Sequence, residues 1–195
     1  MRYDADHKQK THAKLLKTAA KAIRADGPHR IGVAAVMADA GLTHGGFYAH
    51  FASKDALVAA AIGQMFEEAR TRFLHETQER TPSQGLIAYI DFYLSAAHRD
   101  ARRSGCPIAA LASDLPRLKK SALEQFASGA ERLRAALATK LKQLGHVDAE
   151  QEASSAMAEL VGALSLARVE PDAKRSDAIL ADSKRALKTR LKLGH

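Results

Sequence analysis

A chain of 195 residues, of which 46% are apolar, is long enough for one well-buried domain or for a small module joined to a larger one. It contains no run of about 18 uncharged apolar residues, which excludes a transmembrane helix. The charged N-terminus has no apolar signal core, and the single cysteine, Cys106, excludes an internal disulfide framework. We therefore expect a cytoplasmic protein with no membrane partner.

The charge of the chain is strongly basic, with a formal net charge of +8. Such a balance predicts a polyanionic partner, nucleic acid before a membrane surface. Residues 1–56 carry nine Lys and Arg against five Asp and Glu, and the rest of the chain spreads the same surplus over many more residues. The N-terminal quarter is therefore the denser positive field, although a basic surface kept for solubility would have the same composition.

Apolar side chains recur at helical spacing along the chain, and no segment alternates apolar and polar residues as a half-buried strand would. The sequence therefore predicts an all-α fold of about nine helices, beginning with three short ones. The expected helices cover residues 8–25, 33–40, 43–51, 54–79, 86–97, 108–113, 118–144, 150–169 and 176–193.

Residues with strong turn or capping preferences separate these helices. Gly27 and Pro28 end the first helix, because glycine supplies a left-handed cap and proline cannot continue the helix. Gly41 closes the second, and Thr43 and Ser53 are the expected N-caps of the third and fourth. The segment 80–85, "RTPSQG", is the clearest turn cluster between modules.

The segment 41–51, "GLTHGGFYAHF", follows a helix, a short helix and a glycine turn, which is the plan of a helix-turn-helix. Gly45 and Gly46 together cost about 2 kcal/mol in a helix interior relative to alanine. A surface without side chains allows close approach to a sugar-phosphate backbone. Phe47 and Phe51 share one face and should anchor the segment to the core, whereas Tyr48 can point outward.

Other chemistries fit this segment less well. His44 and His50 are six residues apart, about 240° around a helix, so they cannot hold one metal ion as i, i+4 ligands do. The glycine pair matches neither the P-loop nor the dinucleotide-binding pattern, and no nucleophile elbow is present. We expect no metal, no cofactor and no catalytic role here.

The segment "VAAVMADAGLTHGGFYAHFASKDALV" resembles the DNA-binding segment of TetR/AcrR-type bacterial transcriptional repressors. It has the family's Ala-Gly-apolar turn, its aromatic-Tyr-x-His-Phe run and its Ser-Lys-acidic-x-Leu start of the next helix, in order and over residues 12–62. The resemblance implies a helix-turn-helix DNA-binding domain at 1–56 and a helical effector-binding and dimerisation domain at 57–195.

The resemblance also implies which residues contact DNA. Residues at the start of the recognition helix should face bases and backbone, and Tyr48, His50 and Lys54 should hold phosphates. Family members usually place Ser or Thr at the start of the second helix, where this chain has Gly32, whose backbone N–H could serve instead. The predicted DNA-binding residues are Gly32, Thr43, His44, Gly45, Gly46, Tyr48, His50 and Lys54.

In the C-terminal two-thirds, an apolar and aromatic face with a few polar tips is typical of a small-molecule pocket, although each residue alone could belong to an ordinary core. The effector is expected to be apolar. The predicted ligand-binding residues are Phe66, Tyr89, Phe92, Tyr93, Cys106, Leu111, Leu115, Phe126, Met157 and Leu160. Cys106 is expected at a helix N-terminus beside two arginines, as a reactive thiol or as a buried packing residue.

The last two helices carry apolar stripes: Met157, Leu160, Val161 and Leu164, then Ile179, Leu180, Leu187 and Leu191. The resemblance implies that this pair forms a homodimer, although the stripes could also pack within one subunit. The chain is thus predicted to be a repressor that binds a palindromic operator and is released by a small effector. Two alternatives stay open, a ligand-independent DNA-binding protein and a repressor that senses oxidants or electrophiles through Cys106. An enzyme is not expected, because the C-terminal part shows no convergent polar constellation.

Overall fold

The computed structural model describes residues 2–194, which form helices and no strand. The prediction of an all-α fold is confirmed. The elements are α1 (Arg2–Asp26), α2 (Val33–Asp39), η1 (His44–Ala49), α3 (Lys54–Thr77), α4 (Pro82–Tyr93), α5 (Ala96–Asp100), η2 (Arg102–Ser104), α6 (Pro107–Leu111), η3 (Leu115–Arg117), α7 (Lys120–Gln143), α8 (Ala149–Val169) and α9 (Ala173–Arg190), where η marks a 3₁₀ helix.

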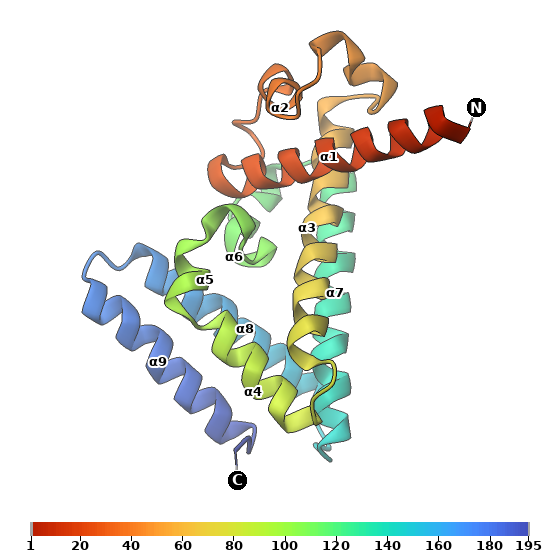
Figure 1. The fold of residues 1–195 in the computed structure, drawn as a ribbon. Coiled ribbons are helices and arrows are strands. Elements are labelled where there is room, and N and C mark those ends of the chain that lie inside the picture. The colour runs from red at the N-terminus through yellow and green to blue at the C-terminus, as the bar shows by residue number, and fades with distance from the viewer. Residues whose placement is uncertain (1, 195) are drawn as a thin grey trace.

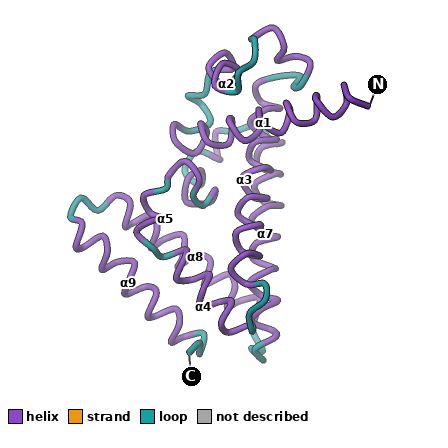
Figure 2. Tube along the Cα trace, in the orientation of Figure 1, coloured by secondary structure: helices purple, strands orange, loops and turns teal. Residues whose placement is uncertain are grey.

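The two longest helices of the C-terminal part, α3 and α7, lie side by side along the height of the molecule (Figure 1). Helix α1 crosses the N-terminal part of α3 steeply, and α2 and η1 lie beyond it at one end. Helices α4, α8 and α9 run obliquely to α3 in the other half of the molecule, where the C-terminus lies (Figure 2). The predicted domain boundary after residue 56 falls inside α3, so one continuous helix joins the two parts.

Local signals end and begin several helices. Gly27 takes a left-handed φ of +84° and its amide donates to the Ile23 carbonyl at 2.9 Å, which ends α1. A capping box opens α4: the Thr81 hydroxyl accepts from the Gln84 amide, and the Gln84 side chain accepts from the Thr81 amide. The end of α1 lies within one residue of the predicted position, whereas α4 begins at Pro82, four residues before the predicted start and inside the segment predicted as a turn.

Several predicted elements differ in extent or type; the helix expected over 86–97, for example, is α4 followed by the separate α5. Helix α1 begins at Arg2, six residues before the first predicted residue, because its polar N-terminal turns carry no apolar periodicity. The expected helix 43–51 is only a 3₁₀ helix, His44–Ala49, in which the Gly46 amide bonds the Thr43 carbonyl three residues back at 3.1 Å. Thr43 occupies the N-cap position, but its hydroxyl accepts no bond.

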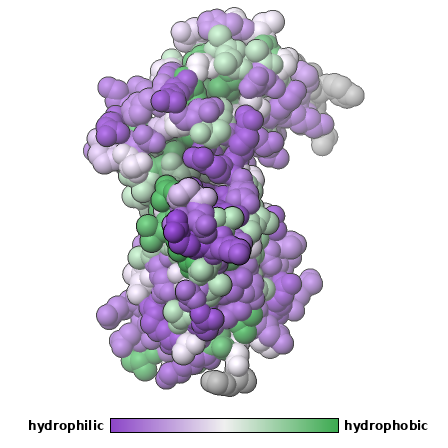
Figure 3. All heavy atoms as spheres, turned by 90° about the vertical axis from the view of Figure 1, so that its left-hand side faces the viewer, coloured by the Kyte–Doolittle hydropathy of each residue, from purple (hydrophilic) through white to green (hydrophobic). Residues whose placement is uncertain are grey.

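The apolar stripes of α8 and α9 pack mainly inside the subunit. Leu160, Leu164, Leu180, Leu187 and Leu191 are all buried in the single chain. Their leucines therefore hold α8 and α9 onto the rest of the fold, and any contact with a second copy must use other residues. The side of the molecule on which α9 lies is mostly hydrophilic, with scattered hydrophobic patches and a waist between two lobes (Figure 3).

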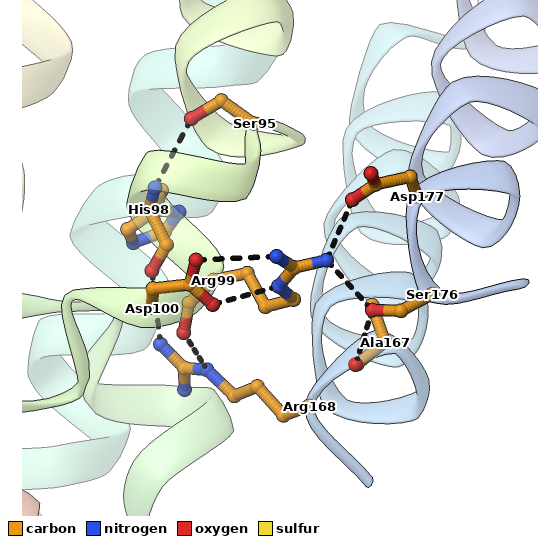
Figure 4. A network of polar contacts seen from close by, with 8 residues as sticks. All are labelled: Ser95, His98, Arg99, Asp100, Ala167, Arg168, Ser176 and Asp177. Carbon is orange, nitrogen blue, oxygen red and sulfur yellow. Dashed lines mark hydrogen bonds and ion pairs between the residues drawn. The ribbon is translucent and has the colours of Figure 1, made fainter. Parts of the chain in front are cut away.

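A network of arginine contacts fixes the segment around α5 to α8 and α9 (Figure 4). Arg99 donates to the Ser176 hydroxyl at 2.8 Å and to the Asp177 carboxylate at 2.7 Å. Arg168 donates to the carbonyl oxygens of Arg99 at 3.1 Å and His98 at 3.3 Å. Since these bonds join residues about 70 positions apart or more, they hold the short helices in place where regular structure is sparse.

Candidate DNA-binding surface and ligand cavity

The segment η1 is anchored by its two phenylalanines, as predicted. Phe47 is 2% exposed and Phe51 is 6% exposed, with ring centroids 6.0 Å apart. On the other side of Phe51 the ring of His12, from α1, stacks at 4.8 Å. Burial of two aromatic side chains stabilises a short helix that has little stability of its own.

The opposite face of η1 is open to solvent. Thr43, His44 and Gly45 are exposed, and the ring of Tyr48 is 74% exposed. A Cβ added at Gly45 would meet no atom within 4 Å, and neither Gly45 nor Gly46 has a positive φ. The protein's own packing and backbone geometry therefore give no reason for glycine at position 45.

The side chains of Lys54 and His50, both predicted to hold phosphates, are partly engaged or buried within the protein itself. The Lys54 ammonium donates to the His29 carbonyl at 3.1 Å, so it fixes the α1–α2 connection with one of its three protons. His50 is half-buried, and its Nδ1 has no hydrogen-bond partner among the described residues. Desolvation lowers the pKa of His50, and the neighbouring His12 and Lys8 lower it further. A neutral His50 could bind phosphate as a donor without charge.

A cavity of about 610 Å³ lies between α1, α3, α4, the segment from α5 to α6, α7 and α8. This volume is in the range of small-molecule sites. The structure brings six of the ten predicted ligand-binding residues together on its wall. They are Tyr89, Phe92, Tyr93, Cys106, Met157 and Leu160.

The other four predicted residues do not line the cavity. Phe66 is 1% exposed and packs edge to face on Phe126, with ring centroids 5.2 Å apart, in the contact between α3 and α7. Leu111 and Leu115 are buried in the core around α6 and η3. All four are large and apolar, and the orientation of each helix about its axis decides whether such a residue faces a cavity or a neighbouring helix.

Several cavity residues were missed because they are basic. Lys17, Lys21 and Arg24 of α1 line it, together with Arg72 and Arg103. The signal was present in the sequence: positions 17, 21 and 24 follow the i, i+4, i+7 spacing of one helical face. From the sequence alone, this face is indistinguishable from a solvated basic surface.

The polar groups of the cavity wall fix the tautomer of His98. Its Nδ1 lies 2.7 Å from the Tyr93 carbonyl, which only accepts, so Nδ1 carries the proton. Its Nε2 accepts from the Cys106 amide at 3.2 Å. Burial lowers the pKa of His98, against the opposing effect of its bond to the Tyr93 carbonyl. The folded protein therefore favours the neutral form of His98, with its proton on Nδ1.

We expect the free energy of unfolding to fall as the pH is lowered below about 6.5, the ordinary pKa of histidine in an unfolded chain. The pKa of His98 is lower in the folded protein than in the unfolded chain, so between these two pKa values the unfolded chain binds more protons. Protonation therefore stabilises the unfolded state in this pH range, and the free energy of unfolding falls as the pH is lowered. His98→Gln should melt at a lower temperature at pH 7.5 but lose less between pH 7.5 and pH 5. A slope equal to that of the wild type in thermal melts would contradict this account. Part of the slope should persist, because the pKa of His50 is also lowered.

Cys106 is the N-cap residue of α6, next to the turn that contains Arg102 and Arg103, as predicted. It is 7% exposed and belongs to the cavity wall. Its amide is tied to His98, so its position is fixed by the backbone. A reagent would reach the thiol through the cavity rather than from the outer surface.

A short exposed helix at one end of an all-α chain, after a helix, a short helix and a glycine turn, follows the helix-turn-helix plan of DNA-binding proteins. The family model of bacterial regulatory proteins, tetR family, matches residues 15–61. The model described as transcriptional regulator LmrA/YxaF-like, C-terminal domain, matches residues 82–181, more than half of the chain. The chain therefore belongs to the TetR family of transcriptional regulators.

Solved structures share the fold. The reduced form of Escherichia coli NemR is 22% identical with a TM-score of 0.81, over 92% of this chain and 96% of that one. A TetR-family regulator from Agrobacterium tumefaciens is 24% identical with a TM-score of 0.79, over 94% and 98%. One from Chloroflexus aurantiacus J-10-FL is 24% identical with a TM-score of 0.81, over 98% and 97%. At this identity the likeness concerns the fold alone. No curated protein sequence matches the chain.

Two further features bear on the class of function. No helix among residues 2–194 is long and apolar enough to cross a membrane. Over the same residues, no three His, Cys, Asp or Glu side chains gather in a way that could hold a metal ion.

Proposed function

We propose that the chain is a one-component repressor of the cytoplasm that binds a palindromic operator as a homodimer and is released by a small molecule. Residues 1–56 would bind DNA, and residues 57–195 would bind the effector and the second copy. The observation that carries the proposal is the exposed face of η1. It presents Tyr48 and a glycine for which packing gives no reason, while Phe47 and Phe51 hold it from behind.

The dimer would use the faces of α8 and α9 that the subunit leaves uncovered. Leu166 is 60% exposed and Val169 is 77% exposed, and a Cβ at Gly162 would meet no atom within 4 Å. A two-fold dimer would place two η1 segments about 34 Å apart or somewhat more, which is the spacing of successive major grooves. Each operator half-site would then bind one copy.

Tyr48→Ala should weaken operator binding about tenfold or more, because it removes an exposed aromatic side chain expected to contact a phosphate and a sugar. Binding is measured by fluorescence anisotropy on the operator at fixed salt. The melting temperature should be unchanged, since the ring packs little. Val147→Ala, which alters a side chain 96% exposed and remote in sequence, is the matched control and should bind normally. Normal binding by Tyr48→Ala would show that η1 is not the reading element.

Gly32→Ser is expected to raise both the stability of the protein and its affinity for the operator. Gly32 is the N-cap of α2 with φ −97° and ψ 132°, a conformation open to serine, and nothing lies within 4 Å of an added Cβ. A serine hydroxyl should cap α2, worth a few tenths of a kcal/mol, and should donate to a phosphate, tightening operator binding about threefold. Gly32→Ala supplies the Cβ without the hydroxyl and should tighten nothing. Equal operator affinities of Gly32→Ser and Gly32→Ala would show that the side chain at position 32 does not contact DNA.

A repressor that senses electrophiles or oxidants through Cys106 is the remaining alternative. It would need the reagent to enter the same cavity, since the thiol belongs to the cavity wall and Cys106 is 7% exposed. A ligand-independent DNA-binding protein has less support, because it has no use for a cavity of about 610 Å³.

A further inference from the structure

The cavity is basic at its border with α1. Lys17, Lys21 and Arg24 come from that helix, and Arg72 and Arg103 add two more cations, whereas Glu68 is the one carboxylate among the lining residues. The Glu68 carboxylate pairs with Arg24 at 2.8 Å, so its charge is already balanced. A cavity with this charge favours an anion over a neutral or cationic ligand.

The cations differ in how far the protein itself satisfies them. Arg72 lies over the Phe92 ring, 4.7 Å from its centroid, and pairs with Glu76. Lys17, Lys21 and Arg103 form no ion pair with the side chains that the structure describes. These three charges are therefore available to a ligand.

Two buried donors on the wall also lack an oxygen or nitrogen acceptor. Arg24 has a side chain that is 1% exposed, and its Nε has no partner among the described residues. The Tyr93 hydroxyl, in a residue that is 5% exposed, has no oxygen or nitrogen partner and lies beside the Cys106 thiol, which is only a weak acceptor. Unsatisfied buried donors are rare and cost free energy, so each of them points to an acceptor that enters from the cavity.

Most of the rest of the wall is apolar, with Ser95, His98 and Ser104 as its polar members. Phe73 and Tyr89 meet edge to face, with ring centroids 4.8 Å apart, and Leu133, Leu137 and Met157 line the cavity from α7 and α8. Such a wall buries a hydrocarbon or aromatic body. Apart from Glu68, which already pairs with Arg24, the lining residues offer no carboxylate to balance a cationic ligand.

We propose that the cavity binds an amphipathic organic carboxylate, with its charged end at Lys17 and Lys21 and its aromatic or aliphatic body against the apolar wall. This inference rests on the proposed function, names the effector class, and replaces the purely apolar effector expected from the sequence. Because both lysines lie on α1, the bound carboxylate would join α1 to the walls from α4, α7 and α8. Its binding would therefore favour one orientation of α1 over another.

The test uses 1-naphthaleneacetate and the neutral 2-(1-naphthyl)ethanol, which share their aromatic body. The chain has no tryptophan, so naphthalene emission can be followed without tryptophan background. At low ionic strength the carboxylate should bind the full-length protein about tenfold more tightly than the alcohol, and added salt should reduce the difference. Equal affinity for the two probes, or no binding of the carboxylate up to millimolar concentration, would overturn the proposal.

Two double variants test where the charged end of the bound carboxylate lies. Lys17→Gln/Lys21→Gln should lower carboxylate affinity to within about threefold of the alcohol and leave alcohol affinity unchanged. Lys10→Gln/Lys14→Gln removes two exposed lysines of α1 outside the cavity and should keep the preference. Equal losses in both variants would assign the effect to the general charge of α1 and overturn the proposal.

Failure of this inference and failure of the proposed function are distinguishable. The binding measurements contain no DNA. A carboxylate preference without release of a bound operator would support the cavity assignment and contradict effector release as the function. Operator binding that is normal, together with no carboxylate preference, would contradict only the ligand class.

Discussion

Gly45→Ala is expected to leave the fold intact and to weaken operator binding about tenfold or more. Position 45 has no positive φ, and an added Cβ meets no protein atom within 4 Å. Alanine should therefore fit, and should raise the melting temperature slightly because glycine is entropically costly in a helix. On DNA, the same methyl would stand where the backbone of η1 has to approach the sugar-phosphate chain.

The opposite signs of these two effects make the variant informative. Thermal melts and anisotropy titrations of the same preparation measure both. Gly63→Ala is a suitable control, because its added Cβ meets only the flexible end of the exposed Gln125 side chain, 3.0 Å away, and lies far along α3 from η1. If Gly45→Ala bound the operator as well as Gly63→Ala, the glycine would have no role in close approach.

Gly129→Ala should destabilise the protein by about 3 kcal/mol through overpacking. A Cβ there would lie 2.2 Å from Cγ of Phe66 and 2.7 Å from its Cβ. Rotation of the ring cannot relieve a contact with Cβ, so α3 and α7 would have to move apart. For a chain of this size the melting temperature should fall by about 6–12 °C.

The same control serves this prediction, since Gly63 also faces α7 from α3. Gly63→Ala should be neutral or slightly stabilising, because alanine is the better helix former. A Gly129→Ala protein as stable as the wild type would mean that α3 and α7 are not in contact at Phe66. Any change in operator binding by a folded Gly129→Ala protein would further indicate that the position of α3 affects η1.

Signals carried by a few neighbouring residues made much of the fold predictable. The left-handed Gly27 and the N-cap Ser53 act through local bonds and lie where predicted, whereas the capping box at Thr81 opens α4 inside the segment predicted as a turn. The type of η1 was not predictable in this way. Its glycines weaken an α-helix, and only the burial of Phe47 and Phe51 against the core sets the conformation that remains.

The two candidate sites differ in the same way in how far the sequence predicts them. The positions expected on the DNA surface follow the order of a motif, and most of them are exposed. The cavity depends on how helices distant in sequence rotate against one another. Phe66 and Phe73 lie on the same helix, yet Phe66 packs against Phe126 while Phe73 lines the cavity. Lys17 and Lys21 share a helical face that the sequence shows, but that this face of α1 meets the cavity depends on how α1 packs against α3 and the C-terminal helices.

The most direct test of the account is selection of DNA from a random duplex library by the full-length protein, followed by sequencing of the bound fraction. The wild type should enrich an inverted repeat whose half-sites are centred about 10 base pairs apart or somewhat more, and Tyr48→Ala should enrich none under the same conditions. A wild type that enriches no inverted repeat, or a Tyr48→Ala protein that enriches the same one, would contradict the claim that the exposed face of η1 reads an operator.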